Sequence, residues 1–345
     1  KLHDNVKIMN KLKTAILGAT GYTGLELIKI LLNHPQVDLF FLGANSNHGS
    51  TLKSLVSNRS IKKNIRVRRN LEILNIKNVD LIFSCLPHGE LPKHLRKFKK
   101  LNSKIIDLGG DYRLNKKMNA LWYKNKRSEE SYKEFQYLIP EINGDKINSK
   151  KNISNPGCYA TSIILGLAPI NTMINNSQSI IVDTKSGTTG AGRSSKVEHS
   201  FSETDENLST YKVGVHQHAP EIEQFIKKIF KKRVKILMVP HLLPIKRGIM
   251  SNIYIKNSSI LHEEKIYREF KKFYSNSKFV RLLKGSMPSL QNVQNTNICE
   301  IGIKILPDKK TLLITSVIDN LIKGAAGQAV QNMNIAYGFD SNLGL

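Results

Sequence analysis

The sequence predicts a two-domain α/β protein, in which a Rossmann-type doubly wound parallel sheet is joined to a second, α+β domain with a mixed, largely antiparallel sheet. Three observations support this class. The length of 345 residues exceeds what one hydrophobic core usually serves. Apolar strands alternate with helical segments up to about residue 155. Beyond that point, strand-like runs follow one another with few helices between them.

The first predicted domain opens with a strand, a glycine turn and a helix. Residues 13–17 form a short apolar run, residues 18–24 contain three glycines, and apolar positions recur at helical spacing over residues 25–32. Further buried strands are expected at residues 37–42, 79–84 and 104–108. Strands that alternate with helices predict a parallel sheet with helices on both faces.

The second predicted domain begins with a helix at residues 160–170. Two more helices are expected at residues 220–230 and 262–274. Strand-like runs occupy residues 179–183, 236–239, 250–256, 296–305 and 312–318. The last segment, residues 320–337, is rich in Ala, Gly and Gln with apolar residues at helical spacing, so it is predicted to be a helix.

The formal net charge of +26 raises the question of nucleic-acid binding. Lysines are spread over the whole sequence together with many asparagines, without a zinc finger, an RNP-type aromatic signature or an isolated basic tail. A compositional bias towards Lys and Asn explains this distribution better. No nucleic-acid partner is therefore expected, although the charge would attract anionic ligands over long range.

The three cysteines, Cys85, Cys158 and Cys299, are widely spaced and form no Cys-x-x-Cys pair. Neither a disulfide framework nor a thiolate zinc site is expected, and no metal is predicted, whereas one thiol is a candidate for reactivity. No apolar run is long enough to cross a bilayer, and residues 1–13 lack the apolar core of a secretory signal. A cytoplasmic protein is expected.

Gly18, Gly21 and Gly24 keep the turn after the first strand free of side chains. Backbone N–H groups and the positive end of the following helix can then approach a pyrophosphate, although a turn with this G-x-x-G-x-x-G spacing can also be purely structural. After the second strand, where a carboxylate would favour NAD, the segment Gly43-Ala-Asn-Ser46-Asn-His48 carries none. NADPH is therefore the expected cofactor, with Ser46 as the contact in this loop.

Cys158 follows Asn155-Pro-Gly157 at the start of an apolar helix. A helix N-terminus stabilises thiolate, so a cysteine in this setting can have a lowered pKa and attack a carbonyl. The alternative is a small buried core residue. Cys85 and Cys299 lie in strand-like apolar surroundings, where buried thiols are expected.

His216 and His218 stand at alternate positions just before a helix that Pro220 begins. The pair could ligate a metal, act in acid–base chemistry or be structural. Because no third ligand has an obvious spacing and a candidate nucleophile lies elsewhere, the acid–base interpretation is the most economical. Glu221 is expected to interact favourably with the helix N-terminus.

Two further segments are candidates for ligand contact. Residues 186–193, Ser-Gly-Thr-Thr-Gly-Ala-Gly-Arg, are too rich in glycine for a strand and predict either a loop that lets the backbone approach a flat ligand or a simple tight turn. Arg113 follows the strand at residues 104–108, and open α/β sheets bind ligands at such strand ends. It can hold an oxyanion through two hydrogen bonds, or it can be an ordinary surface arginine.

Seven segments carry a resemblance to a known family. They are Gly18-Ala-Thr-Gly-Tyr-Thr-Gly24, Ser84-Cys-Leu-Pro-His-Gly89, Asp107-Leu-Gly-Gly-Asp-Tyr-Arg-Leu114, Asn155-Pro-Gly-Cys-Tyr-Ala-Thr161, residues 186–193, His216-Gln-His-Ala-Pro-Glu221 and residues 319–330. Over nearly the whole chain, they resemble the N-acetyl-γ-glutamyl-phosphate reductases of arginine biosynthesis, within the aspartate-semialdehyde dehydrogenase-like group. Gln217, where a basic residue is frequent, and Thr188-Thr189 are slight departures that remove no group needed for chemistry.

The resemblance implies an NADPH-dependent reduction of an acyl phosphate to an aldehyde through a thioester, which accepts hydride more readily than a free carboxylate. Cys158 is then the nucleophile and His218 its acid–base partner. The residues implied for substrate binding are Arg113, Asn155, Arg193 and His216. Those implied for the cofactor are Gly18, Thr20, Gly21, Tyr22, Thr23, Gly24, Ser46, Pro87, Gly190 and Asn320.

The resemblance also implies a discontinuous NADP-binding domain, residues 1–155 and 319–345, around a catalytic and oligomerisation domain of residues 156–318. A homodimer or homotetramer is expected, because the second sheet commonly forms the subunit interface in relatives. Two rival functions stay open. One is a relative acting on aspartyl phosphate or on an N-acetylated aminoadipyl phosphate, and the other is a basic nucleotide- or nucleic-acid-binding protein without catalysis.

Overall fold

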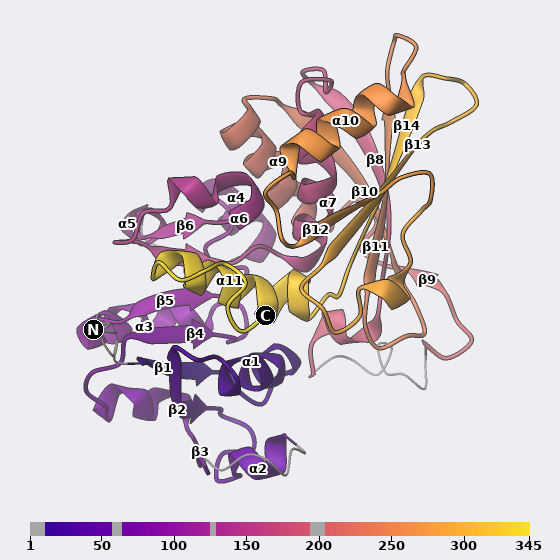
Figure 1. The fold of residues 1–345 in the computed structure, drawn as a ribbon. Coiled ribbons are helices and arrows are strands. Elements are labelled where there is room, and N and C mark those ends of the chain that lie inside the picture. The colour runs from indigo at the N-terminus through magenta and orange to yellow at the C-terminus, as the bar shows by residue number, and fades with distance from the viewer. Residues whose placement is uncertain (1–10, 57–63, 125–128, 194–203) are drawn as a thin grey trace, which may run out of the picture.

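The computed structural model describes residues 11–56, 64–124, 129–193 and 204–345, and its strands form two sheets (Figure 1). The first sheet has seven parallel strands in the order β3-β2-β1-β4-β5-β7-β6. They are β1 Leu12–Leu17, β2 Val37–Gly43, β3 Val67–Arg68, β4 Leu81–Ser84, β5 Lys104–Asp107, β6 Phe135–Tyr137 and β7 Asn152–Ser154. The strand order reverses between β1 and β4, which confirms the predicted Rossmann-type sheet. Most of residues 1–13, considered above as a signal, lie outside the described part.

Helices cover both faces of this sheet because successive side chains of a strand point to opposite sides. Along β1, Ile16 packs in the cluster that contains Leu27 of α1, whereas Leu17 packs in the cluster that contains Leu91 of α3. The helices of this part are α1 Tyr22–Leu32, α2 Leu52–Leu55, α3 Glu90–Phe98, α4 Lys116–Tyr123, α5 Glu129–Lys133 and α6 Pro140–Asn143.

The second sheet is mixed, with the order β12-β13-β14-β11-β8-β10-β9. Its strands are β8 Gln178–Ser186, β9 Ser209–Thr210, β10 Val234–Leu242, β11 Ile249–Lys256, β12 Val280–Leu283, β13 Cys299–Ile305 and β14 Thr311–Ile318. The pairs β8–β10 and β12–β13 are parallel, and the other neighbours are antiparallel. The predicted mixed, largely antiparallel second sheet is therefore confirmed.

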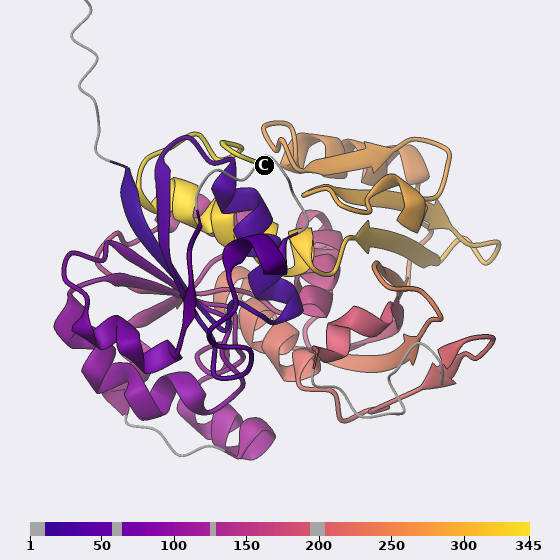
Figure 2. The ribbon, with the colours of Figure 1, turned by 90° about the horizontal axis from the view of Figure 1, so that it is seen from below.

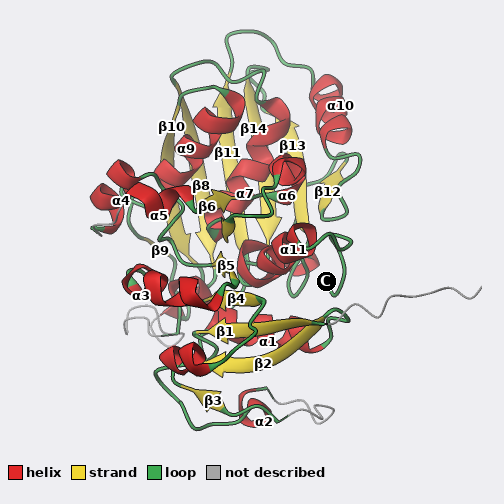
Figure 3. Cartoon of the chain, turned by 90° about the vertical axis from the view of Figure 1, so that its left-hand side faces the viewer, coloured by secondary structure: helices red, strands yellow, loops and turns green. Residues whose placement is uncertain are grey.

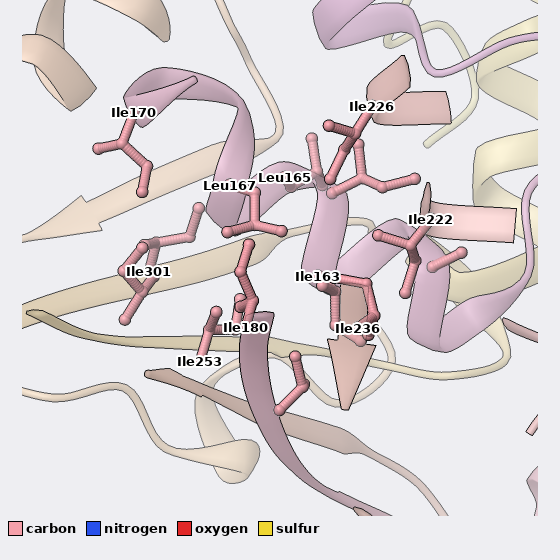
Figure 4. Close-up of a cluster of buried hydrophobic side chains, with 14 of the residues drawn as sticks. Ile163, Leu165, Leu167, Ile170, Ile180, Ile222, Ile226, Ile236, Ile253 and Ile301 are labelled. Atoms are coloured by element: carbon pink, nitrogen blue, oxygen red, sulfur yellow. The ribbon is translucent and has the colours of Figure 1, made fainter. Parts of the chain in front are cut away.

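One face of the second sheet is covered by α7 Cys158–Leu167, α9 His218–Phe230 and α10 Glu263–Phe273 (Figure 1). Figure 4 shows Ile163 and Ile222, from α7 and α9, packed with Ile180 and Ile253 of the sheet. On the other face, side chains such as Ile181 on β8 stay exposed. On β8 and β10, the side chains of this second face therefore stay partly or fully exposed, whereas on β13 and β14 residues such as Val317 are buried there.

Helix α7 begins at Cys158 and gives way to a 3₁₀ turn, Ala168–Ile170, so the helix expected at residues 160–170 is displaced at its start. Pro169 ends the α-helical hydrogen bonding because it has no N–H group. The Leu165 carbonyl, which an α-helical N–H at residue 169 would have served, accepts the Tyr274 hydroxyl instead. The nucleophile candidate is thus the first residue of a helix whose other positions are buried.

The C-terminal segment returns from the second sheet to the first. The single helix expected at residues 320–337 is corrected to a short π-helical segment, Ile322–Ala326, followed by α11 Gly327–Ala336. Val330 of α11 packs in the same cluster as Leu27 of α1, and Figure 2 shows the two helices side by side. Figure 3 shows α7 and α11 where the two sheets meet. No helix in the described ranges is long and apolar enough to span a membrane.

Candidate active site

The glycine turn lies between β1 and α1, at the carboxyl end of the first sheet. Gly18 has φ of +76°, and a Cβ atom there would collide with the Cys85 carbonyl. A Cβ atom on Gly24 would lie 2.8 Å from Ala19 Cα. Gly21 is the N-cap of α1 and offers no capping side chain. The turn is therefore a backbone cradle at a helix N-terminus, which fits a pyrophosphate group.

The other cofactor residues predicted in the first domain lie along the same edge. Tyr22 and Thr23 begin α1. Ser46 is exposed in the loop after β2, and its carbonyl accepts a 3.5 Å hydrogen bond from Thr20 Oγ1. Pro87 is exposed in the loop after β4. The carboxyl ends of three neighbouring strands thus carry these residues, as the doubly wound sheet predicts.

Gly190 of the second domain and Asn320, just after β14, complete the predicted cofactor set. Gly190 lies in a 3₁₀ turn, Thr188–Ala191. Asn320 Nδ2 donates to Thr189 Oγ1 at 3.0 Å, so the side chain is held against this turn. Arg193 Nη1 donates to the Thr20 carbonyl at 2.8 Å, which places the expected substrate-binding arginine on the glycine turn of the first domain.

Cys158 lies where three segments converge. Gly157 is the N-cap of α7, and a Cβ atom on it would collide with the His218 ring and lie 2.8 Å from Arg113 Nη1. From the other side, a Cβ atom on Gly324 would lie 2.7 Å from Cys158 Cβ. The π-helical segment therefore packs directly on the cysteine, and only glycine fits at position 324.

Burial raises the pKa of Cys158 to about 11, although Arg113 and the N–H groups of Cys158 and Tyr159 act in the opposite direction. The expected lowering of this pKa is therefore wrong for the protein without substrate, because desolvation outweighs the helix N-terminus. The thiol is protonated at neutral pH and needs a base. Burial also raises the pKa of Cys85, which directly follows β4 rather than lying within it, and raises that of Cys299 to about 12.

Both histidines are buried and neutral. Burial lowers the pKa of His218 well below its usual value, with further lowering by His216 and Arg113. Burial, and then Lys212, lower the pKa of His216 to about 3. His216 Nδ1 accepts a hydrogen bond from the backbone N–H of His218 at 3.2 Å, and the two ring centroids are 4.7 Å apart. Within the described residues, His218 Nδ1 has no hydrogen-bond partner, and no group of three or more His, Cys, Asp or Glu side chains could hold a metal ion.

Arg113 is only 8% exposed, so the surface-arginine alternative is wrong. Its Nε donates to the Asn155 carbonyl at 2.8 Å and its Nη2 to the Leu108 carbonyl at 2.7 Å. Its Nη1 lies 3.4 Å from His218 Nε2. Backbone carbonyls thus orient the guanidinium, and Nη1 is the nitrogen that faces the site.

Asn155 is buried, and its side chain is engaged within the protein. Its Nδ2 donates to the Ala325 carbonyl at 3.2 Å, and its Oδ1 accepts from Asn332 Nδ2 at 2.9 Å. The asparagine expected at the substrate therefore ties the end of β7 to the π-helical segment and to α11.

Glu221 is a site residue whose position the sequence did not reveal. Its Oε1 accepts the Gly157 N–H at 2.8 Å and the Tyr137 hydroxyl at 2.7 Å. Its Oε2 lies 3.8 Å from Arg113 Nη1 and 4.0 Å from His218 Nε2. Burial raises the pKa of this carboxyl, and Arg113 opposes that shift. The spacing of three positions from His218 could have indicated a shared helix face, but not the buried arginine.

This fold and this site define a two-domain dehydrogenase. The first sheet carries a nucleotide cradle, and a cysteine lies beside a histidine at the second sheet. Family models match in the same arrangement. The semialdehyde dehydrogenase NAD binding domain matches residues 13–150, and the semialdehyde dehydrogenase dimerisation domain matches residues 158–320.

Curated relatives narrow the class. A protein named N-acetyl-gamma-glutamyl-phosphate reductase from Clostridium botulinum is 43% identical over 343 residues, covering 97% of this chain and 98% of that protein. One of the same name from Campylobacter jejuni is 40% identical over 339 residues, with the same coverage of 97% and 98%. The chain belongs to the N-acetyl-γ-glutamyl-phosphate reductase family.

Solved structures support the fold at lower identity. An aspartate semialdehyde dehydrogenase from Vibrio cholerae matches with a TM-score of 0.74 at 17% identity, covering 95% of this chain and 99% of that one. The Candida albicans aspartate semialdehyde dehydrogenase with NADP matches with a TM-score of 0.70 at 16% identity, covering 97% and 100%. These similarities concern the two-domain architecture.

Proposed function

We propose that this chain reduces N-acetyl-γ-glutamyl phosphate to N-acetyl-glutamate 5-semialdehyde, with release of phosphate, through a thioester on Cys158. The observation that carries the proposal is the convergence of Cys158, His218 and Arg113 at the N-terminus of α7. The substrate is taken from the names of relatives that are 43% and 40% identical.

The first step is transfer of the Cys158 proton to His218. The ring is neutral, and its Nε2 packs on Gly157, the residue before the cysteine. Glu221 Oε2, 4.0 Å from this nitrogen, favours the imidazolium that forms. The thiolate then attacks the acyl carbon, the bond to the phosphate oxygen breaks, and inorganic phosphate leaves. The protonated ring stabilises the negative charge on the carbonyl oxygen.

NADPH, when bound, supplies the hydride that reduces the thioester carbon. The turn that contains Gly18, Gly21 and Gly24 would give its pyrophosphate room at the N-terminus of α1, close to Thr20, Tyr22 and Thr23. Ser46 and Pro87 lie on the neighbouring strand ends. Gly190 and Asn320, which lie together at the end of the second sheet, would contact the cofactor from the other side. His218 returns its proton as the thiohemiacetal collapses and Cys158 leaves as the thiol.

Arg113 Nη1 and His216 are proposed to hold the anionic and polar groups of the substrate. Arg113 is preoriented by two backbone carbonyls, so little side-chain freedom is lost on binding. Arg193 is proposed to serve the phosphoryl side from its place on the glycine turn, and Asn155 to act through the backbone it orients.

The test is phosphate-dependent reduction of NADP+ with N-acetyl-glutamate semialdehyde. Cys158→Ser should lower the rate by about a thousandfold or more, because the hydroxyl is a far weaker nucleophile. Cys299→Ala, which removes a thiol buried in the second sheet, is the matched control and should keep the rate. Near-normal activity of Cys158→Ser would contradict the thioester mechanism.

The same assay separates the rival substrates. Aspartate semialdehyde and N-acetyl-aminoadipate semialdehyde should be turned over more slowly than N-acetyl-glutamate semialdehyde. If either is preferred, the substrate assignment fails while the mechanism stands. Salt-sensitive binding to duplex DNA at physiological ionic strength, without reductase activity, would instead favour the basic nucleic-acid-binding alternative.

We propose the same domain limits as the sequence implied, with residues 1–155 and 319–345 forming the NADP-binding domain and residues 156–318 forming the catalytic and oligomerisation domain. Packing of Val330 beside Leu27 supports this division. A cytoplasmic location is part of the proposal.

A second copy of the chain is proposed to cover the open face of the second sheet, where Ile181 is 51% exposed and Leu237 is 39% exposed. The family model named for dimerisation overlaps this sheet. Ile181→Lys should shift the mass measured by light scattering from dimer or tetramer towards monomer. A wild-type chain that is monomeric at micromolar concentration would contradict the assembly.

A further inference from the structure

Glu26 is an acidic side chain in an unfavourable place. It lies in the helix that follows the glycine turn and is only 7% exposed. A buried carboxylate is costly without a compensating cation, and its charge near this helix N-terminus opposes an anionic ligand. Lys29 pairs with it at 2.8 Å but is 51% exposed, so this pair contributes little.

The compensating cation comes from the second domain. Arg247, in the loop between β10 and β11, contacts Glu26 Oε1 through Nη2 and Asp319 Oδ2 through Nη1 at 3.2 Å. Asp319 is fully buried and also accepts the N–H groups of Asn295, Leu321 and Ile322. The planar guanidinium thus joins a carboxylate of α1 to a fixed carboxylate beside the π-helical segment.

The backbone around Arg247 also holds two parts of the proposed cofactor site, the Gly190 turn and Asn320. The Ile245 and Lys246 carbonyls accept the N–H groups of Thr188 and Thr189 at 2.9 and 3.3 Å. The Gly248 N–H donates to Asn320 Oδ1 at 2.9 Å. One loop therefore positions the Gly190 turn and Asn320 through its backbone, and α1 through its arginine side chain.

We propose that Arg247 is a positioning residue that sets the Gly190 turn and Asn320 at a fixed distance from the glycine turn, so that one NADP(H) molecule can contact both domains. This inference rests on the proposed cofactor site. The binding of a ligand that contacts both domains depends on the contacts of Arg247 with Glu26 and Asp319, whereas the binding of a ligand confined to the first domain does not. The removal of a negative charge from α1 acts on both ligands alike.

The test is isothermal titration of the full-length protein with NADP+ and with 2′-phospho-ADP-ribose, which lacks the nicotinamide. In the wild type, NADP+ should bind more tightly than the fragment. In Glu26→Gln, this advantage of the intact cofactor should fall about tenfold, the change that corresponds to ~1.4 kcal/mol. Lys29→Met removes the other cation of Glu26 and leaves Arg247 in place, so it should keep the wild-type ratio.

A second variant changes Arg247, the partner of Glu26 in this ion pair. Arg247→Lys keeps the charge, but the compact ammonium group lacks the planar fork that directs two nitrogens at two carboxylates. Its ratio should therefore lie between those of the wild type and Glu26→Gln. The rate of Cys158 alkylation by iodoacetamide should stay unchanged in each variant. KM for NADP+ should rise more than KM for the semialdehyde. A protein that is merely destabilised would instead show a lower kcat, whichever of the two substrates is varied.

Equal changes for NADP+ and the fragment, or an unchanged ratio in both Glu26→Gln and Arg247→Lys, would overturn the inference. Failure of the proposed function has a different signature. In that case, the wild-type protein itself would bind NADP+ no better than 2′-phospho-ADP-ribose, before any substitution is made.

Discussion

The glycine turn and the charged cluster beside Cys158 solve two binding problems by different means. The turn relies on its backbone: Gly18 and Gly24 leave no room for a Cβ atom, and Gly21, the N-cap of α1, carries no capping side chain. The cluster uses buried side chains, because Arg113 meets His218 and Glu221, both of α9, at Gly157.

The difference shows how each region tolerates change. A backbone cradle depends on local conformation, so its failure is steric and does not depend on pH. A cluster of buried charges depends on mutual compensation, so the loss of one member leaves another uncompensated and moves the protonation of the rest.

The largest effect is expected when the cluster is broken at Glu221. Glu221→Gln keeps the shape but leaves Arg113 buried without its counter-charge, which should lower the free energy of unfolding by about 3 kcal/mol. The reductase rate should fall by about a hundredfold, since acid–base catalysis by His218 loses its support. Urea denaturation and the coupled assay measure the two effects.

Glu223→Gln is the matched control on the same helix. Glu223 is half-buried and accepts the Ile236 N–H at 2.8 Å. It should lose little stability and no activity. If the two variants behave alike, the cluster does not depend on compensation.

The next effect concerns the cradle. Gly18→Ala requires a residue with φ of +76° and pushes Cβ into the Cys85 carbonyl, so it should cost about 2 kcal/mol or more and abolish NADP+ binding. Gly338→Ala has a similar φ of +75°, but nothing lies within 4 Å of its Cβ position. It should cost only about 1 kcal/mol, and calorimetric titration should show normal NADP+ binding.

The smallest effect concerns the pH dependence of the cluster. The pKa of His216 is about 3 in the folded protein, so between pH 6.5 and 3 the unfolded chain binds a proton that the folded chain does not. Stability should therefore fall as the pH falls, by up to about 1.4 kcal/mol per pH unit. His216→Gln should reduce this slope by the contribution of His216, while that of His218, whose pKa burial also lowers, remains. Denaturation between pH 4 and 6 measures the change.

A control variant and the contribution of another buried group bear on that measurement. His262→Gln changes an exposed histidine and should leave the slope as in the wild type. Burial, and then Asp111, raise the pKa of Asp107 to about 7, so this group acts with the opposite sign as the pH falls. Because Asp107 is present in both proteins, its contribution cancels in the difference. An unchanged slope in His216→Gln would contradict the neutral, buried assignment.

The parts of the molecule that local sequence specifies were predictable. The longer strands of both domains follow from hydrophobic periodicity, whereas short strands such as β6 and β7 were not expected. The glycine turn follows from three spaced glycines. The position of Cys158 at a helix start follows from the Pro-Gly turn before it. In each case, the residues that carry the information are neighbours in the chain.

What could not be predicted depends on contacts between distant segments. Arg113 and His218 are 105 positions apart, so neither the burial of the arginine nor its closeness to the imidazole is visible in the local pattern. The sign of the Cys158 pKa shift depends on how much surrounding structure removes water from the thiol. The π-helical segment could not be predicted either, because it depends on the Asp319 carboxylate at its start and on the approach of Gly324 to Cys158.

The C-terminal return has a consequence for how the protein is made. Ala329, Val330 and Met333 complete the hydrophobic cluster that holds α1 against the first sheet, yet they follow all strands of the second sheet in the chain. The cluster around α1 can therefore be completed only after the strands of the second sheet have been synthesised. A nascent chain that stops before residue 322 lacks both the lining of the nucleophile and the closing piece of the nucleotide fold.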